Sequence, residues 1–183
     1  MKKGLYKFIF FRLMGWKIVG TIPKEVNKCV LMILPHTSWH DFYLGIFTRG
    51  ITQIPMHFIG KRELFRFPFG YYFNWMGGKP LDRSGKLNKV EAIAGLFTKY
   101  DELRLAIAPE GTRKKVTELK SGFYYIALAA KVPIIGVTFN FGKKEVTFDI
   151  PFMPTGNYEA NLKILLQHFN GVKGKIPEYS FEV

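Results

Sequence analysis

Apolar runs of strand length alternate along the chain with longer amphipathic stretches. Within each run most successive residues are apolar, so both faces of the expected strand are apolar. Such strands are typical of a covered, largely parallel sheet. One further strand, after a turn at residues 141–144, is expected to pair antiparallel with the strand before it. The expected strands are residues 29–34, 56–60, 104–108, 132–139 and 145–152.

Two of the amphipathic stretches repeat apolar residues at helical spacing. Their apolar faces are Val90, Ile93, Phe97 and Tyr100 within residues 87–100, and Leu162, Leu165, Leu166 and Phe169 further on. Strands alternating with helices predict an α/β fold, with a mostly parallel central sheet covered by helices. The sequence has no internal repeat or linker, so residues 1–183 are expected to form a single domain.

The first 20 residues mix aromatic and aliphatic side chains with lysines and an arginine. Charges interrupt the stretch too often for a spanning helix, and the small-residue cleavage site of a secretory signal is missing. Cations beside aromatic rings suit the membrane interface, where a short segment can lie against anionic headgroups. A terminal helix packed on its own domain explains the same residues equally well, and the sequence leaves both interpretations open.

The chain carries a strong positive charge. Its 183 residues include 27 Lys and Arg against 14 Asp and Glu, a formal net charge of +13. This charge favours an anionic partner, which could be nucleic acid, an acidic membrane, a phosphorylated small molecule or an acidic carrier protein. With 48% hydrophobic residues the chain can build a core. The single cysteine, Cys29, excludes an internal disulfide and is expected to be buried packing.

A histidine and an aspartate follow the first expected strand. His36 precedes a helix that is expected to begin near Trp39, with Thr37 or Ser38 as its cap. If His36 lies in the turn and Asp41 in the first helical turn, the carboxylate can orient the imidazole and leave its other nitrogen free as a base. One histidine near one aspartate also occurs for purely structural reasons, so the interpretation depends on what accompanies the pair.

Two glycine-containing turns with arginines accompany the pair. Residues 77–85 join glycines and a proline to Arg83, and residues 109–113 place Pro-Glu-Gly-Thr-Arg after an apolar strand. Glycine lets the backbone approach a ligand, and arginine binds phosphate through two parallel hydrogen bonds. Because parallel strands end at one edge of a sheet, the turns after the first and third expected strands can converge. We therefore expect His36 and Arg113 to face one crevice.

Four blocks, in order between residues 31 and 137, resemble the glycerolipid acyltransferases, which include the bacterial 1-acylglycerol-3-phosphate acyltransferases. The blocks are His36 with Asp41, the stretch ending at Arg83, residues 109–113 and residues 132–135. The resemblance implies the glycerol-3-phosphate acyltransferase-like fold, with His36 as general base and Asp41 as its orienter. It also implies an acceptor or phosphate site formed by Lys61, Arg83, Glu110, Gly111, Thr112 and Arg113, with Pro133 on the hydrophobic, acyl side.

Three positions depart from the family pattern. Pro35 stands where many members have asparagine, Ala108 where phenylalanine is common, and Gly136 where a second proline often closes the fourth block. These positions flank the expected chemistry and do not perform it. The chain is also shorter than many members and lacks a long hydrophobic anchor, so it resembles a compact bacterial version.

The implied reaction is attack by an acceptor hydroxyl on an acyl thioester carried by coenzyme A or acyl carrier protein. Lysophosphatidate is the leading acceptor, while glycerol 3-phosphate or an amino-acid-based lyso-lipid would fit the same scaffold. The expected location is peripheral, on the cytoplasmic face of the inner membrane, with an anionic membrane surface as partner. Beyond the thioester substrate no cofactor is expected. No metal is expected either, because His40, His57 and His168 lack ligand spacing with Cys29.

Two other classes of function fit parts of the sequence. A nonenzymatic membrane-surface protein would use the N-terminal aromatic residues and the aromatic patch at residues 65–69. A nucleic-acid-binding module, a partner we do not expect, would track phosphates with Lys61, Arg62, Arg66, Lys114, Lys115 and Lys120. These two classes explain the positive charge or the aromatic residues of the sequence. Neither explains the four blocks that occur in the order of the acyltransferase family.

Overall fold

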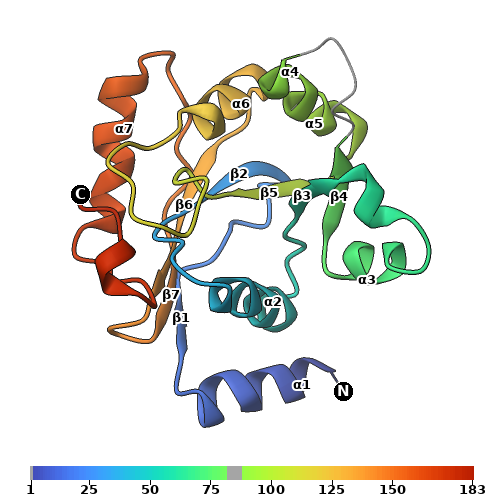
Figure 1. The fold of residues 1–183 in the computed structure, drawn as a ribbon, viewed down its shortest axis with the longest axis vertical. Helices are drawn as coiled ribbons and strands as arrows, with labels where there is room; N and C mark the ends of the chain where they lie inside the picture. Colours follow the sequence, from blue (N-terminus) through green and yellow to red (C-terminus); the bar gives the residue numbers. More distant parts are fainter. Residues whose placement is uncertain (1, 82–87) are drawn as a thin grey trace.

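Five strands form the central sheet in the computed structural model, which describes residues 2–81 and 88–183. The strand order is β1-β7-β6-β2-β5 (Figure 1). Strand β2 pairs in parallel with both β5 and β6, whereas β7 is antiparallel to β6 and parallel to β1. The expected mostly parallel α/β sheet is confirmed. The strands are β1 (Lys17–Val19), β2 (Lys28–Ile33), β5 (Leu103–Ile107), β6 (Ile134–Asn140) and β7 (Glu145–Phe148).

Helices cover both faces of this sheet (Figure 1). Both faces of β2 carry apolar side chains that must be covered. Val30 and Met32 belong to one core cluster, and Cys29 and Leu31 belong to the other. The first cluster lies under α4 to α7 and the second under α1, η1 and α2. The helices are α1 (Lys2–Lys7), η1 (Phe8–Leu13), α2 (His40–Thr52), α4 (Lys89–Ala94), α5 (Leu96–Lys99), α6 (Gly122–Ala130), α7 (Tyr158–Leu166), η3 (Gln167–Phe169) and η4 (Pro177–Tyr179).

A second, two-stranded parallel sheet lies beside the first. It pairs β3 (Phe58–Lys61) with β4 (Gly78–Leu81), and an isolated bridge from His57 to Leu105 joins it to β5. The strand expected at residues 56–60 therefore exists but lies outside the central sheet. Between its two strands the chain forms η2 (Arg62–Phe65) and α3 (Gly70–Trp75) at the right of Figure 1.

Two expected helices differ in detail from the sequence pattern. The helix at residues 87–100 is divided at Gly95 into α4 and α5, and the Asn88 side chain caps α4 by accepting a hydrogen bond from the Glu91 amide. The helix that carries Leu162 and Leu165 ends at Leu166 and continues as the short η3. Both breaks are local, so the apolar faces still pack on the sheet.

The N-terminal segment packs on its own domain and leaves several apolar side chains exposed. Phe10 and Trp16 are buried in the core under α2, whereas Leu5, Phe8 and Leu13 are exposed. Within the described residues, none of the helices has the length and apolarity needed to cross a bilayer. The segment is therefore anchored to its own domain and still presents an apolar outer face.

Candidate active site

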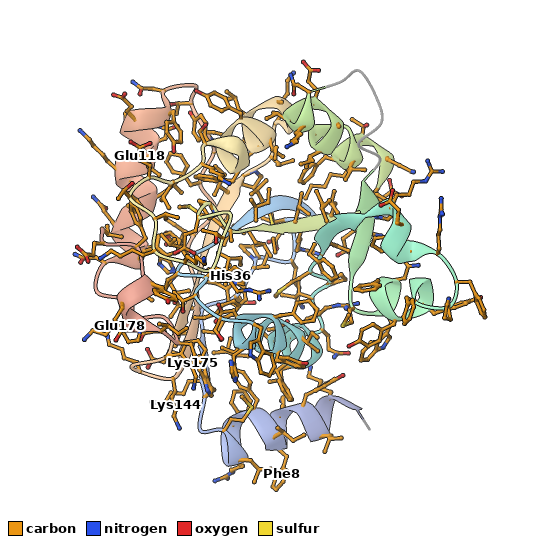
Figure 2. The ribbon with its side chains drawn as sticks, in the orientation of Figure 1. Phe8, His36, Glu118, Lys144, Lys175 and Glu178 are labelled. Atoms are coloured by element: carbon orange, nitrogen blue, oxygen red, sulfur yellow. The ribbon has the colours of Figure 1, made fainter. Side chains whose placement is uncertain are left out.

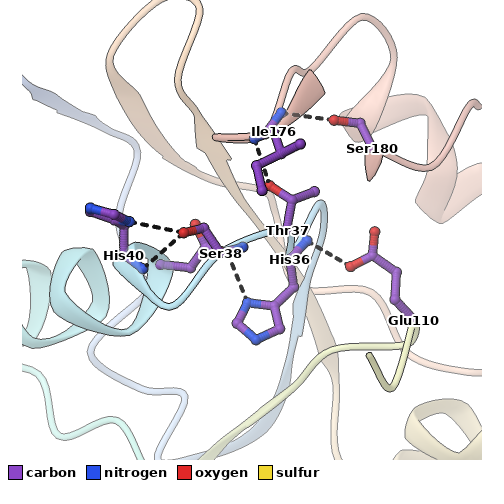
Figure 3. A network of polar contacts seen from close by, with 9 residues as sticks. His36, Thr37, Ser38, His40, Glu110, Ile176 and Ser180 are labelled. Carbon is purple, nitrogen blue, oxygen red and sulfur yellow. Dashed lines mark hydrogen bonds and ion pairs between the residues drawn. The ribbon is translucent and has the colours of Figure 1, made fainter. Parts of the chain in front are cut away.

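The expected site residues come together because β2 and β5 are neighbours. The two strands run in the same direction with Met32 beside Ile107, so the chain leaves both at the same edge of the sheet. His36 lies three residues beyond the end of β2, in the turn that leads into α2. The Glu110 to Arg113 turn lies beyond the end of β5. Sheet topology thus places residues 36 and 110 side by side (Figure 3).

His36 and Asp41 are in contact. His36 Nδ1 lies 3.0 Å from Asp41 Oδ2, and the same carboxylate oxygen accepts a hydrogen bond from the Ser38 amide at 3.0 Å. Asp41 is buried, whereas the His36 side chain is 24% exposed. A carboxylate at Nδ1 keeps the proton on that nitrogen and leaves Nε2 as the basic one. The geometry is the turn-and-helix arrangement that the spacing predicts.

The buried carboxylate of Glu110 holds the backbone of His36. Its Oε2 accepts a hydrogen bond of 2.6 Å from the His36 amide (Figure 3). Burial, with a smaller contribution from the Asp41 charge, raises the pKa of Glu110 to about 7 against the lowering effect of His36. This placement differs from the acceptor-binding role expected for Glu110, because the carboxylate is only 2% exposed and already bonded to the protein. Its contact positions the histidine.

The two residues after His36 form hydrogen bonds with the C-terminal segment and with the first turn of α2. Thr37 Oγ1 accepts a hydrogen bond from the Ile176 amide at 3.1 Å, so Thr37 does not cap α2. Ser38 Oγ accepts a weak bond from the His40 amide at 3.3 Å and lies 2.9 Å from His40 Nδ1. The His40 ring packs on Trp39, away from Asp41. His40 thus contacts Ser38 and Trp39, while His36 contacts Asp41.

The contact between the C-terminal segment and Thr37 was not predicted from the sequence. Gly174 passes so close to Thr37 that an added Cβ would lie 2.8 Å from Thr37 Cγ2, and the Gly174 amide donates to Ser180 Oγ at 3.0 Å (Figure 3). Nothing in the local pattern near Gly174 indicates a partner more than a hundred residues away. The contact depends on the assembled fold.

His36 and Arg113 line one surface hollow, as expected. We call it the Arg113 hollow; it is lined by His36, Thr37, Ser38, Trp39, Gly111, Thr112, Arg113, Lys114, Ile176 and Tyr179. Arg113 and Thr112 are exposed there, and the Thr112 hydroxyl accepts a hydrogen bond from the Lys114 amide. Gly111 has φ +64°, and an added Cβ would lie 2.6 Å from Lys120 Nζ, so the turn favours glycine. The hollow therefore offers exposed cations beside the histidine.

A second space, the apolar cavity, starts at the same pair and runs between α2 and the sheet. Its volume is about 240 Å³, and His36 and Asp41 lie in its wall. The rest of the wall is mainly apolar: Leu31, Ile33, Phe42, Gly45, Ile46, Met56, Phe58, Met76, Ala106, Ala108, Val137, Phe139, Val146 and Phe148, with Thr48, Arg49 and His57. Burial lowers the pKa of His57 to about 4, helped by Lys79 and Arg49, so this wall histidine is neutral at pH 7. The cavity suits a hydrocarbon chain.

Two expected site residues lie elsewhere in the structure, and a third cannot be placed from the described residues. Arg83 lies outside the described residues, and Lys61 belongs to β3, the smaller sheet. Pro133 precedes β6, where its carbonyl accepts a hydrogen bond from the Val30 amide. That position is the edge where β2 and β6 begin, opposite to His36. The wall of the apolar cavity takes Val137 and Phe139 from β6 instead.

Across residues 2–81 and 88–183, His, Cys, Asp and Glu form no group of three that could hold a metal ion. Cys29 is buried, and burial raises the pKa of its thiol to about 12 despite the nearby Arg104.

The chain is similar to known acyltransferases in sequence and in fold. The 1-acyl-sn-glycerol-3-phosphate acyltransferases of Salmonella typhimurium and Escherichia coli are each 29% identical over 133 residues, which cover 68% of this chain. The chain spans about half (53%) of the length of these relatives. The crystal structure of the 1-acyl-sn-glycerophosphate acyltransferase PlsC from Thermotoga maritima matches the fold, with a TM-score of 0.59. That match has 22% sequence identity and covers 94% of this chain and 80% of the other.

The sequence model of the Acyltransferase family matches residues 17–140, a region that includes β1 to β6, His36, Asp41 and the turn at residues 110–113. The match covers more than half of the chain. This protein therefore belongs to the Acyltransferase family.

Proposed function

We propose that this protein transfers a fatty acyl group from a thioester to the free hydroxyl of a lyso-lipid of the glycerol phosphate type. Lysophosphatidate is the acceptor that the site favours, and phosphatidate is then the product. The observation that carries the proposal is the position of His36, which lies both in the Arg113 hollow and in the wall of the apolar cavity. A base at this junction lies between a phosphate-binding surface and a space for an acyl chain.

His36 acts as the general base in this proposal. Its Nε2 takes the proton of the acceptor hydroxyl while that oxygen attacks the thioester carbon. The carbon–sulfur bond then breaks, and the imidazolium returns the proton to the leaving thiolate, so no covalent acyl-enzyme forms. Asp41, 3.0 Å from Nδ1, stabilises the imidazolium between the two steps. A positioned base of this kind contributes about 10² to 10⁴-fold in rate.

Arg113 binds the phosphate of the acceptor in this proposal. Its exposed guanidinium lies in the same hollow as His36, and Lys114 adds a second cation. A guanidinium can hold two phosphate oxygens at once, which fixes the direction of the rest of the lipid. Lys61 and Arg83 remain proposed contributors. Glu110 takes part by holding the His36 backbone.

The acyl chain occupies the apolar cavity, and the thiol carrier remains at the surface. Either coenzyme A or acyl carrier protein serves as carrier, since both are anionic and the chain has a formal net charge of +13. The reaction uses no cofactor beyond this thioester substrate. The lipid acceptor brings the protein to a membrane surface, where we propose peripheral attachment on the cytoplasmic face.

A product screen by mass spectrometry tests this proposal. The purified protein is offered lysophosphatidate with acyl-CoA or with acyl carrier protein thioesters, in detergent and on vesicles. We expect phosphatidate from at least one donor, and a rate at least tenfold lower with monoacylglycerol, which lacks the phosphate that Arg113 binds. Equal use of the two acceptors contradicts the phosphate site. No acylated product with any donor, acceptor or surface contradicts the proposed function.

A further inference from the structure

An aromatic patch on α3 and the loop before it is unused by the proposed chemistry. Its members are exposed by 54% to 88%, which is unusual for large rings that lie close together in sequence. We call them the α3 patch: Phe67, Phe69, Tyr71, Tyr72 and Trp75. Contiguous exposed apolar surface of this kind marks a site of interaction.

A second exposed apolar face lies on the N-terminal helices. Leu5, Phe8 and Leu13 are 55% to 69% exposed, while Phe10 on the same segment is fully buried. Phe8 points away from the domain at the lower edge of Figure 2. The buried Phe10 fixes these helices to the core, so the outer face is presented in a defined direction.

A hollow that we call the α2 hollow lies beside the N-terminal helix and one ring of the α3 patch. Lys3 and Tyr6 of α1, Gly50 of α2, and Trp75 and Met76 all line it. The Arg49 guanidinium on α2 also donates a hydrogen bond of 2.8 Å to the Trp75 carbonyl, which ties the α3 patch to α2. Helix α1 and Trp75 therefore border the same hollow.

The α2 hollow adjoins the apolar cavity of the candidate site. Ile46, Arg49 and Met76 line both spaces. Only these side chains therefore need to separate the hollow beside Trp75 from the cavity whose wall contains His36. The adjacency places one exposed aromatic side chain close to the site of the proposed chemistry.

The charges around these faces identify the partner. Residues 1–24 contain no acidic residue, and Lys3, Lys7 and Arg12 are exposed on the N-terminal helices. Arg66 is exposed next to Phe67 in the α3 patch. Aromatic rings flanked by cations suit the interface of an anionic phospholipid bilayer, where the rings enter the acyl boundary and the cations meet the phosphates.

We propose that the α3 patch is a second lipid-binding surface, which works with the N-terminal helices to seat the protein on an anionic bilayer. The α2 hollow then faces the lipid, and an acyl chain reaches the apolar cavity from the bilayer. The entry of the acyl chain rests on the proposed function, whereas the binding of the bilayer by the α3 patch does not.

Native tryptophan fluorescence tests the surface directly, since the chain has three tryptophans and Trp75 belongs to the patch. A Trp16→Phe, Trp39→Phe variant leaves Trp75 as the only reporter. On vesicles of phosphatidylglycerol we expect its emission to shift to the blue and to be quenched by brominated acyl chains. Vesicle binding with an unchanged Trp75 spectrum overturns the proposal, and so does the absence of vesicle binding by the full chain.

Removing two rings measures what the patch contributes. The Phe67→Ser, Phe69→Ser variant should partition onto phosphatidylglycerol vesicles about tenfold to a hundredfold less than the wild type. Ile150→Ser is the matched control, because Ile150 is 78% exposed on the loop after β7. Equal partitioning of the double variant and the control contradicts the proposal. A wild-type dimer in solution that the double variant abolishes would assign the patch to a second copy instead.

These binding measurements need no acyl transfer, so they separate the inference from the proposed function. The double variant should also transfer acyl groups to vesicle-bound lysophosphatidate more slowly, while keeping its rate in detergent micelles. Loss of binding with equal rates on vesicles would contradict acyl entry from the bilayer. Binding by the wild type without any transfer would contradict the proposed function and leave the lipid surface supported.

Discussion

At the scale of single residues, the site depends on a histidine that is held at two points. Asp41 contacts the imidazole, and the buried Glu110 accepts a hydrogen bond from the amide of the same residue. The first contact follows from sequence spacing, because a turn and one helical turn bring residues 36 and 41 together. The second requires the neighbouring strands β2 and β5, so the role of Glu110 could not be predicted without the fold.

Glu110 makes the stability of the protein depend on pH. Burial raises its pKa from 4.5 to about 7 in the folded state. Between these two pH values the carboxyl group is therefore protonated in the folded protein and ionised in the unfolded chain. The contribution of this group to stability is complete below pH 4.5 and is lost as the pH rises through about 7. Glu110→Gln keeps an oxygen for the His36 amide and removes the titration.

Urea denaturation of the wild type and of Glu110→Gln between pH 4.5 and 8 measures this effect. We expect the free energy of unfolding of the wild type to fall by about 3 kcal/mol more than that of the variant over this range. Other titrating groups are common to both proteins and cancel in the difference. If the free energy of unfolding changes equally with pH in both proteins, the pKa of Glu110 is not raised by folding.

At the scale of elements, the buried strands are the most predictable part of the fold. Strands β2, β5 and β6 have long apolar runs, and β7 follows a glycine-containing turn, so their positions follow from pattern. The short β1 and β4 were not expected, because Lys17–Val19 has three residues and Gly78–Leu81 contains glycine and proline. Their pairing is set by distant partners, Glu145–Phe148 and Phe58–Lys61.

Helix α2 controls the length of the acyl chain in the proposed function. Gly45 lines the apolar cavity, and a Cβ built there meets no atom within 4 Å. Gly45→Leu should fill part of the cavity and lower transfer of the longest accepted chains by about tenfold to a hundredfold, while shorter chains are still used. Mass spectrometry of products from a mixture of donors gives this ratio within one reaction.

Gly45→Ala is the graded control for this prediction. Its single methyl group has room, and alanine favours a helix over glycine, so we expect a nearly unchanged chain-length profile and an equal or higher melting temperature. If Gly45→Leu folds and its product lengths match those of Gly45→Ala, the apolar cavity does not hold the acyl chain.

At the scale of the whole molecule, three spaces lie next to one another. The Arg113 hollow and the apolar cavity share His36, and the α2 hollow shares Ile46, Arg49 and Met76 with the cavity. Sequence order alone predicted the meeting of His36 with Arg113, because parallel strands end at one edge. It could not predict the cavity or the α2 hollow, since each wall combines residues from three or more elements.

The role of His36 is the central claim, and the turnover number of His36→Ala tests it most directly. With saturating lysophosphatidate and thioester, we expect kcat about 10² to 10⁴-fold below the wild type, with an unchanged circular dichroism spectrum and melting temperature. His40→Ala, which removes the neighbouring histidine that contacts Ser38 and Trp39, should keep kcat within a few-fold. A folded His36→Ala protein with the turnover number of the wild type would contradict the account.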